Sequence, residues 1–241
     1  MRHFSKSAQI PCTLLTAPTP TKASEVDPKY YKAPDVKEQL QKDQFYKCAY
    51  CEKKIEGAYN DVEHYRPKSK YYWLGHAWTN LLFACNICNR TCKKDEFPLS
   101  DESKRHLNEK SIAGEDPLVI NPAEEDPADY IVFNRAMAQP RVVDGEESIK
   151  GRYNIGLFRL NDRTELVAER KASYELFEQK LEALRMTKTI VKEVNPEDPV
   201  REKIVNLVKC LEKSIEALTS PDAQYSGMLI NNLAYPQNID L

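Results

Sequence analysis

Hydrophobic positions in the first fifth of the chain predict one helix after an irregular start. Residues 1–33 are rich in Pro, Thr, Ser and Lys and show no sustained period, so we expect an extended arm that packs loosely on the rest of the protein. Pro34 then suits the first turn of a helix, in which Val36, Leu40 and Tyr46 fall roughly on one face. This predicted helix leads directly into a stretch of different character.

The second half of the chain carries two longer helical patterns. Asp162 and Glu165 have the spacing of a capping box at the start of the first helix, and Asp198-Pro199 starts the second. Apolar residues recur at helical spacing in both: Leu166, Tyr174, Phe177, Leu181 and Leu184, then Ile204, Val208, Leu211, Ile215 and Leu218. Because two facing apolar stripes satisfy each other, a helical hairpin core is favoured over a partner-binding surface.

Shorter elements are predicted around these helices. Residues 130–134 and 141–144 have the pattern of a β-hairpin, in which Pro140 restricts the second strand to a sheet edge. Further helices are expected from about Glu146 to Phe158 and over residues 225–234. The sequence has no internal repeat and no Gly-rich phosphate loop, so no ATPase activity of its own is expected.

The stretch from Cys48 to Pro98 contains two Cys-x-x-Cys pairs. Two tight turns that each supply two thiolates are typical of a structural zinc site, which predicts Zn²⁺ on Cys48, Cys51, Cys85 and Cys88. The alternative is four buried reduced thiols. Cys92 lies four residues after Cys88 and on a helix would face the same way, so its membership of the site stays open.

Between and after the cysteine pairs, the pattern predicts a strand, a loop, a second strand and a helix. The first strand spans residues 59–63 and ends at His64, residues 77–83 lead into the second, and residues 86–94 have a helical pattern. The fold class expected for the chain is therefore α+β, with this zinc-clamped module embedded in a mostly α-helical protein. The corresponding division is 1–46 as arm and lead-in helix, 47–98 as the module, and 99–241 as a mainly helical region.

Polar residues of this module fit the hydrolysis of a phosphodiester. His64 is suited to act as general base, because a neutral imidazole accepts a proton from water near neutral pH. Glu63 and Asn89 supply oxygen ligands for Mg²⁺ or Mn²⁺. Asn80 is expected to hydrogen-bond the loop backbone and thereby orient His64. Each residue taken alone has an ordinary structural explanation, and only their joint spacing favours catalysis.

Charge is distributed unevenly along the chain. The formal net charge is −2, yet residues 47–94 hold nine Lys or Arg against four Asp or Glu, a local charge of +5. We expect contacts with a phosphate backbone from Lys68, Lys70, Arg90, Lys93 and Lys94. The alternative is a solvated basic face. The seven cysteines and the absence of an apolar run long enough for a signal peptide or a membrane span predict a cytoplasmic protein.

Four motifs together resemble the HNH endonucleases, the ββα-metal class, of the kind with an accessory four-cysteine zinc site. They are the first Cys-x-x-Cys pair, EHYRPKS at 63–69, WTNLL at 78–82 and CNICN at 85–89. The resemblance implies His64 as general base, Asn80 as the loop-orienting residue, and Glu63 and Asn89 as ligands of the catalytic ion. The third letter of the motif is Asn89 rather than His.

A narrower resemblance extends beyond the motif. CAYCE at 48–52, the Phe97-Pro98 pair and PLVINP at 117–122 are similar to the HNH subunits of Septu and retron-associated antiphage systems. This implies an ATPase partner, for which residues 99–241 would be the docking region, and a nucleic-acid substrate, DNA rather than RNA. The alternative is a catalytically weak or inactive HNH-fold zinc module that binds nucleic acid or the ATPase without cutting. A zinc-finger transcription factor is disfavoured, because the chain lacks an Arg-rich recognition helix.

Overall fold

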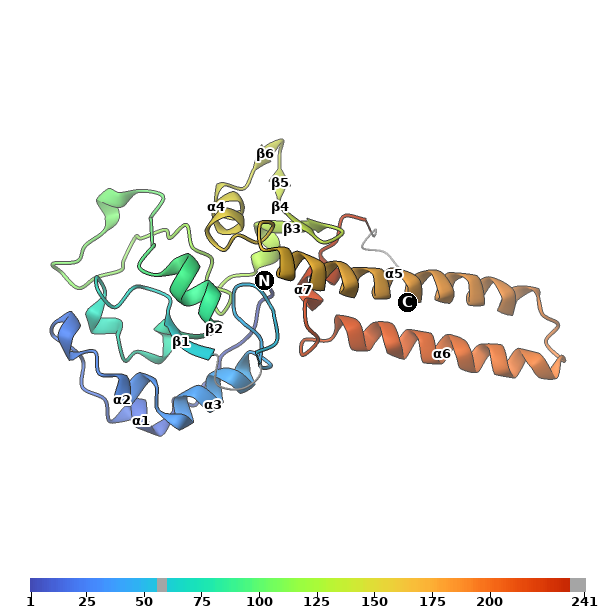
Figure 1. The fold of residues 1–241 in the computed structure, drawn as a ribbon, viewed down its shortest axis with the longest axis horizontal. Coiled ribbons are helices and arrows are strands. Elements are labelled where there is room, and N and C mark those ends of the chain that lie inside the picture. Colours follow the sequence, from blue (N-terminus) through green and yellow to red (C-terminus); the bar gives the residue numbers. More distant parts are fainter. Residues whose placement is uncertain (56–59, 235–241) are drawn as a thin grey trace.

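The structure, a computed structural model, describes residues 1–55 and 60–234. Most of the chain before about residue 160 forms one packed body, from which a long helical hairpin projects (Figure 1). The mixture of helices with three small two-stranded sheets confirms the α+β class. Within the described residues, no helix combines the length and apolarity needed to cross a membrane.

The N-terminal segment packs more tightly than the sequence predicted. It contains short helices α1 (Cys12–Leu15) and α2 (Pro28–Tyr31), and it contributes Phe4, Leu14 and Tyr31 to the hydrophobic core. The expectation of a loosely packed arm was therefore wrong, because apolar side chains without a regular period still reach a common core.

The lead-in helix is α3 (Pro34–Asp43), in which Val36 and Leu40 are fully buried as expected. Tyr46 was wrongly placed on this apolar face. The helix ends before it, Tyr46 has a positive φ of 58° and its side chain is half exposed. The turn that removes Tyr46 from the helix brings the chain to the first cysteine pair.

The predicted strand–loop–strand–helix order is confirmed. Strand β1 (Asn60–His64) pairs antiparallel with β2 (Leu81–Cys85), with Glu63 opposite Leu82 and His64 opposite Leu81. A π-helix, Ile87–Lys93, follows β2 at once. Tyr59, which was included in the predicted first strand, lies outside the described residues. Because β2 is buried along its whole length, the polar side chains of β1 are held against a rigid support.

The predicted hairpin forms with a different register. Strand β3 (Ile131–Asn134) pairs with β4 (Met137–Pro140), so the chain turns at Arg135-Ala136 rather than across residues 136–140. The residues assigned to the second strand instead begin a separate hairpin of β5 (Val142–Val143) and β6 (Glu146–Glu147). Pro140 occupies the end of β4, where a missing N–H is tolerated.

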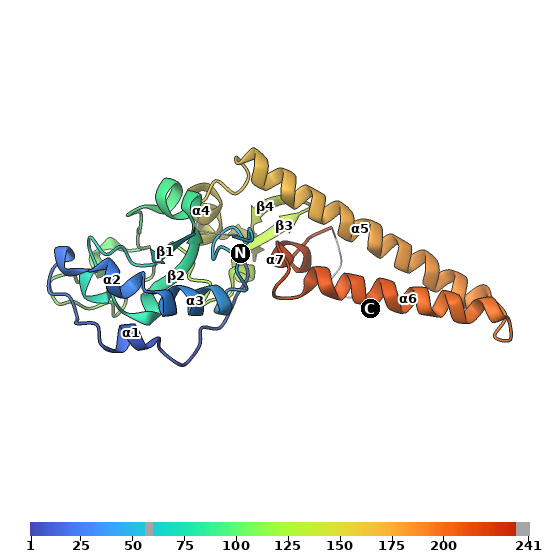
Figure 2. The same ribbon diagram turned by 60° about the horizontal axis from the view of Figure 1, so that its bottom comes forward.

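The C-terminal half is mainly helical as expected, with α4 (Ile149–Leu157), α5 (Thr164–Glu193), α6 (Pro199–Thr219) and α7 (Ser226–Ile230). Helices α5 and α6 lie antiparallel and extend away from the body (Figures 1 and 2). All five predicted apolar residues of α5 are buried, as are Leu211 and Ile215 of α6. The predicted final helix is shorter than expected, because it ends at Ile230.

The two long helices begin in different ways. Asp198 caps α6 through a hydrogen bond from the Val200 N–H at 2.8 Å, as predicted. The capping box predicted for α5 does not form, because Arg163 occupies the N-cap position and its side chain makes no cap bond. The start of α5 lies beside the cysteine module instead.

Candidate active site and metal centre

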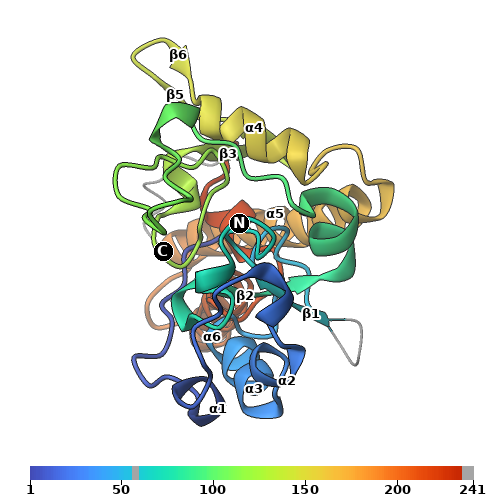
Figure 3. The ribbon, with the colours of Figure 1, turned by 90° about the vertical axis from the view of Figure 1, so that its left-hand side faces the viewer.

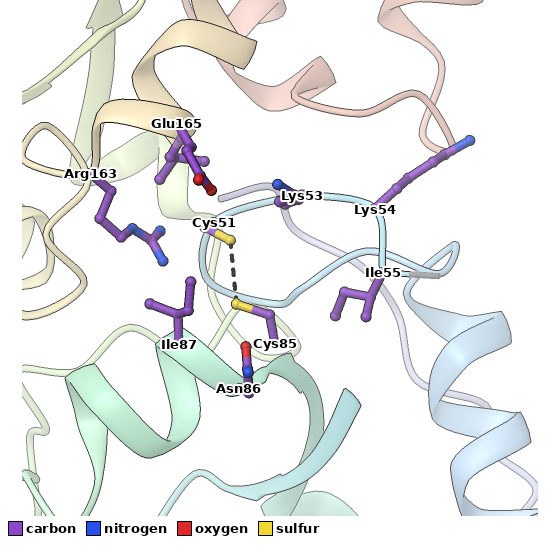
Figure 4. A pocket seen from close by; sticks show the side chains of 10 residues that line it. Cys51, Lys53, Lys54, Ile55, Cys85, Asn86, Ile87, Arg163 and Glu165 are labelled. Atoms are coloured by element: carbon purple, nitrogen blue, oxygen red, sulfur yellow. Dashed lines mark hydrogen bonds between the residues drawn. The ribbon is translucent and has the colours of Figure 1, made fainter. Parts of the chain in front are cut away.

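The two Cys-x-x-Cys turns bring four sulfur atoms together. The Sγ atoms of Cys48, Cys51, Cys85 and Cys88 all lie within 4.8 Å of one another, and those of Cys51 and Cys85 are 3.9 Å apart (Figure 4). Tetrahedral zinc with thiolate bonds of about 2.3 Å requires sulfur separations of roughly 3.8 Å. The donor set and its spacing therefore fit Zn²⁺. Cys92 is not part of this group within the described residues.

The four thiols differ in how readily they lose a proton. Burial raises the pKa of Cys48 and of Cys88, whereas hydrogen bonds from neighbouring cysteines lower the pKa of Cys51 and of Cys85. The Cys88 N–H also donates to the Cys85 sulfur at 3.4 Å. All four thiols are buried and interact with one another, which matches a site that becomes fully deprotonated when a metal ion binds.

A second site lies beside β1. A pocket of about 390 Å³ is lined by Asp61, Glu63 and His64 of β1, by Asn89 and by flanking basic residues, among them Lys68, Arg90 and Lys94. Three of the four predicted catalytic residues thus meet at one cavity. Asn80 lies behind it and is almost completely buried.

His64 is buried and held in one orientation. Its Nε2 lies 2.9 Å from the Gly75 carbonyl oxygen, and the Tyr31 ring packs edge-on against the imidazole at 4.6 Å between centroids. Since a carbonyl only accepts, Nε2 carries the proton and Nδ1 is the unprotonated nitrogen. Burial lowers the pKa of His64 to about 4, against the opposing effect of the Gly75 carbonyl, so the neutral form prevails at neutral pH.

Glu63 is paired with a buried lysine. The Lys93 Nζ lies 2.6 Å from Glu63 Oε1 and also donates to the His64 carbonyl oxygen at 3.0 Å. Burial raises the pKa of Glu63 to about 7, although the Lys93 ammonium opposes the rise. Tyr50 contacts the same oxygen at 3.4 Å. Among the described residues, the contacts of this carboxylate therefore involve Oε1, and Oε2 remains for another ligand.

Lys93 corrects one prediction about nucleic-acid contacts. Its side chain has no exposed surface, so it is a buried partner of Glu63 and does not face a phosphate chain. The basic residues at the end of the helix suggested that Lys93 is exposed to solvent. Its position on the helix directs its side chain into the protein interior instead. Lys70 and Lys94 are exposed, and Lys68 is half-buried with its Nζ 2.9 Å from the Tyr31 hydroxyl.

Asn80 hydrogen-bonds the loop that follows β1. Its Oδ1 accepts from the Arg66 N–H at 2.8 Å, and its Nδ2 donates to the carbonyl oxygens of Arg66 at 3.1 Å and Leu74 at 3.2 Å. Leu74 immediately precedes Gly75, whose carbonyl holds His64. Asn80 therefore fixes both ends of the loop around the imidazole.

Asp61 and Tyr31 are among the pocket residues that the sequence analysis did not identify. Asp61 is buried and accepts two hydrogen bonds from the exposed Arg90, at 2.6 and 2.5 Å; although burial opposes it, this guanidinium holds the pKa of Asp61 below its usual range. Tyr31, from the N-terminal segment, supports His64 and Lys68. The two-residue spacing of Asp61 and Glu63 on one strand was a usable signal, whereas nothing in the sequence placed Tyr31 here.

Comparison with known proteins agrees with this geometry. Residues 48–95 match the family described as HNH endonuclease. The chain is 30% identical over 231 residues to the Septu protein PtuB of Bacillus mycoides (strain KBAB4), covering 87% of this chain and 77% of that protein. It is 26% identical over 190 residues to the Septu protein PtuB of Bacillus thuringiensis, covering 77% and 65% respectively. The chain therefore belongs to the Septu PtuB proteins and is an HNH endonuclease.

Proposed function

We propose that this HNH endonuclease hydrolyses nucleic-acid phosphodiesters, DNA in preference to RNA, with His64 as general base. The observation that carries the proposal is the fixed tautomer of His64. Its Nε2–H is held by the Gly75 carbonyl, so the Nδ1 lone pair is available at a pocket that Glu63 and Asn89 also line.

In the proposed reaction, Nδ1 of His64 takes a proton from water while the water oxygen forms a bond to phosphorus. The bond from phosphorus to the leaving oxygen breaks, and the leaving oxygen takes a proton from solvent. Glu63, through Oε2, and Asn89 would hold Mg²⁺ or Mn²⁺, which supplies charge stabilisation at the phosphate. Asn80 keeps the loop and hence His64 in place. Contacts with the phosphate chain are assigned to Lys68, Lys70, Arg90 and Lys94.

The cellular role is inferred from the relatives rather than from the site. Both carry the name Septu protein PtuB, and on this basis we assign the chain to an antiphage defence system as its effector nuclease. Residues 99–241 would dock an ATPase partner, and their projecting hairpin of α5 and α6 extends away from β1 (Figure 1). The reduced cysteines of the zinc site are consistent with a cytoplasmic protein.

The test compares nicking of supercoiled plasmid and cleavage of total RNA in Mg²⁺ or Mn²⁺, with and without the proposed ATPase partner. His64→Ala should remove cleavage, whereas His3→Ala, which changes an exposed histidine, should cut like the wild type. Full activity of His64→Ala would contradict the assigned base. No cleavage by any combination, with zinc bound, would favour the alternative of a binding module that does not cut.

A further inference from the structure

The half-buried Arg163 directs its positive charge at the zinc-binding cysteines. Its Nη1 lies 3.5 Å from the Cys88 sulfur, and Figure 4 shows its guanidinium pointing towards the Cys51 and Cys85 pair. Its Nε and Nη2 are buried and have no hydrogen-bond partner among the described residues, and no carboxylate there forms an ion pair with it. Among the described residues, the cysteine cluster is therefore the group that interacts with the Arg163 guanidinium.

A four-thiolate zinc site needs such a charge. Four thiolates around Zn²⁺ carry a net charge of −2, and burying an uncompensated charge is costly. Three of these cysteines are almost wholly inaccessible to solvent. A guanidinium presents several N–H groups in a fixed plane and stays protonated, so it can donate to more than one sulfur.

Arg163 is also the N-cap residue of α5, and the first cysteine turn is bonded to the C-terminal elements. Lys53 forms an ion pair with Glu169 of α5 at 2.5 Å, and the Glu52 carboxylate accepts from the Gly227 N–H of α7 at 2.9 Å. In the view from the left-hand side of Figure 1, the body lies in front and helices α5 and α6 lie behind it (Figure 3).

We propose that Arg163 offsets part of the negative charge of the zinc tetrathiolate and that the zinc centre thereby anchors the α5–α6 hairpin to the nuclease module. Arg163 is a positioning residue, which stabilises the metal-bound thiolates without being a ligand. The hairpin should lose its fixed attachment when zinc is removed. This inference does not depend on nuclease activity.

The first experiment measures zinc release to a chromogenic chelator from the full chain. Removal of a residue that hydrogen-bonds a metal ligand typically lowers metal affinity by about 10–100-fold, so Arg163→Met and Arg163→Gln should release zinc faster by a similar factor. Arg163→Lys, which keeps the charge, should fall between them and the wild type. Arg185→Met, which changes an exposed arginine of α5 far along the helix, should release zinc at the wild-type rate.

A second readout separates charge compensation from a general packing role. In the Co²⁺-substituted protein, the sulfur-to-metal charge-transfer band should shift to longer wavelength in Arg163→Met, because the sulfur lone pairs lose a stabilising positive charge. Arg185→Met should leave the band unchanged. If Arg163→Met does not fold, the comparison of Arg163→Gln with Arg163→Lys replaces it, and equal release rates in that pair would overturn the proposal.

The anchoring step is tested by amide hydrogen exchange of the wild type with and without zinc. Zinc removal should increase exchange in residues 164–170 more than in 181–190, which lie farther from the cysteines along the same helix. Unchanged exchange at the start of α5 after zinc removal would refute the anchoring role, and a wild-type zinc release rate in Arg163→Met would refute the charge role.

Discussion

Burial of ionisable side chains governs the chemistry of individual residues around β1. His64 is kept neutral, and Glu63 has a raised pKa although a lysine ammonium lies 2.6 Å away. The Arg90 guanidinium donates hydrogen bonds to the neighbouring Asp61 carboxylate. Each of these states arises from neighbours supplied by other elements, so residue type alone does not define them.

Lys6 predicts a pH dependence of stability. Its Nζ lies 3.9 Å from the centre of the Trp78 ring and donates to the Leu81 carbonyl oxygen at 2.6 Å. Burial lowers the pKa of Lys6 to about 7, although the negative charges of Asp43 and Glu124 oppose this decrease. Between this pKa and the ordinary value of 10.5, the folded protein binds fewer protons at Lys6 than the unfolded chain. Stability should therefore rise with pH across that window, by at most about 1.4 kcal/mol per pH unit.

Urea unfolding at pH 7.5 and pH 9.5 tests this. Lys6→Met should abolish the part of the pH dependence due to this residue, whereas Lys22→Met, at an exposed position, should behave as the wild type. A wild-type pH dependence in Lys6→Met would show that Lys6 does not titrate in this range.

Asn80 predicts a linked loss of stability and cleavage. Asn80→Ala removes three hydrogen bonds and leaves the Arg66 N–H without its buried acceptor, which should cost about 1–3 kcal/mol of unfolding free energy. Cleavage should fall because the loop no longer fixes His64. Denaturant unfolding and plasmid nicking provide the two readouts, with exposed Thr79→Ala as the control. Normal cleavage by Asn80→Ala would contradict the proposed role of Asn80 in orienting His64.

At the scale of elements, the two strands and the π-helix owe their arrangement to the cysteine turns that flank them. The first pair precedes β1, and the second spans the end of β2 and the start of the helix. Such a small sheet buries little surface by itself, so a metal that joins both turns contributes strongly to its stability.

Cys48→Ser should remove one thiolate and unfold the module, because structural zinc contributes on the order of 10 kcal/mol to folding. We expect a zinc content well below one ion per chain and loss of the cooperative thermal transition. Cys210→Ser, which changes an exposed cysteine outside the cluster, should retain both. Unchanged melting and metal content in Cys48→Ser would contradict a structural zinc site.

The helical hairpin makes a separate prediction about packing. Leu181 is 1% exposed between α5 and α6, whereas Leu176 on the same helix is 44% exposed. Leu181→Ala should lower the unfolding free energy by about 2–5 kcal/mol, and Leu176→Ala should have a much smaller effect. Guanidinium unfolding measures both, and equal effects would mean that the apolar stripe of α5 faces solvent or a partner instead of α6.

At the scale of the whole molecule, a net charge of −2 hides a basic surface near the pocket. Lys68 and Lys94 line the pocket and Lys70 is exposed on the loop after β1, while Lys93 is buried in the interior. Binding of nucleic acid is therefore expected to depend on local rather than net charge.

The logarithm of the association constant for a short DNA duplex should fall linearly with the logarithm of the salt concentration. Lys70→Gln should weaken binding and reduce the magnitude of the slope by about 1, as for the loss of one phosphate contact. Lys213→Gln, an exposed lysine on α6, should leave the slope unchanged. Fluorescence anisotropy across a salt series gives both values, and an unaltered slope in Lys70→Gln would exclude this lysine from the interface.

The sequence by itself determined the features that depend on local spacing. Two Cys-x-x-Cys pairs specified four clustered sulfurs, and the motif residues specified a strand ending at His64. Helical periodicity specified the buried face of α5 and, of the five residues predicted for α6, the buried Leu211 and Ile215. These inferences succeeded because metal geometry and helix geometry constrain residues that are close in sequence or repeat regularly.

Only the tertiary structure decided the contacts between distant segments. It placed Tyr31 against His64, turned Lys93 inward to Glu63, and set Arg163 beside Cys88 in place of the predicted helix cap. Neither periodicity nor motif spacing encodes such contacts, because each depends on how separately folded elements pack and on where a buried charge finds its partner.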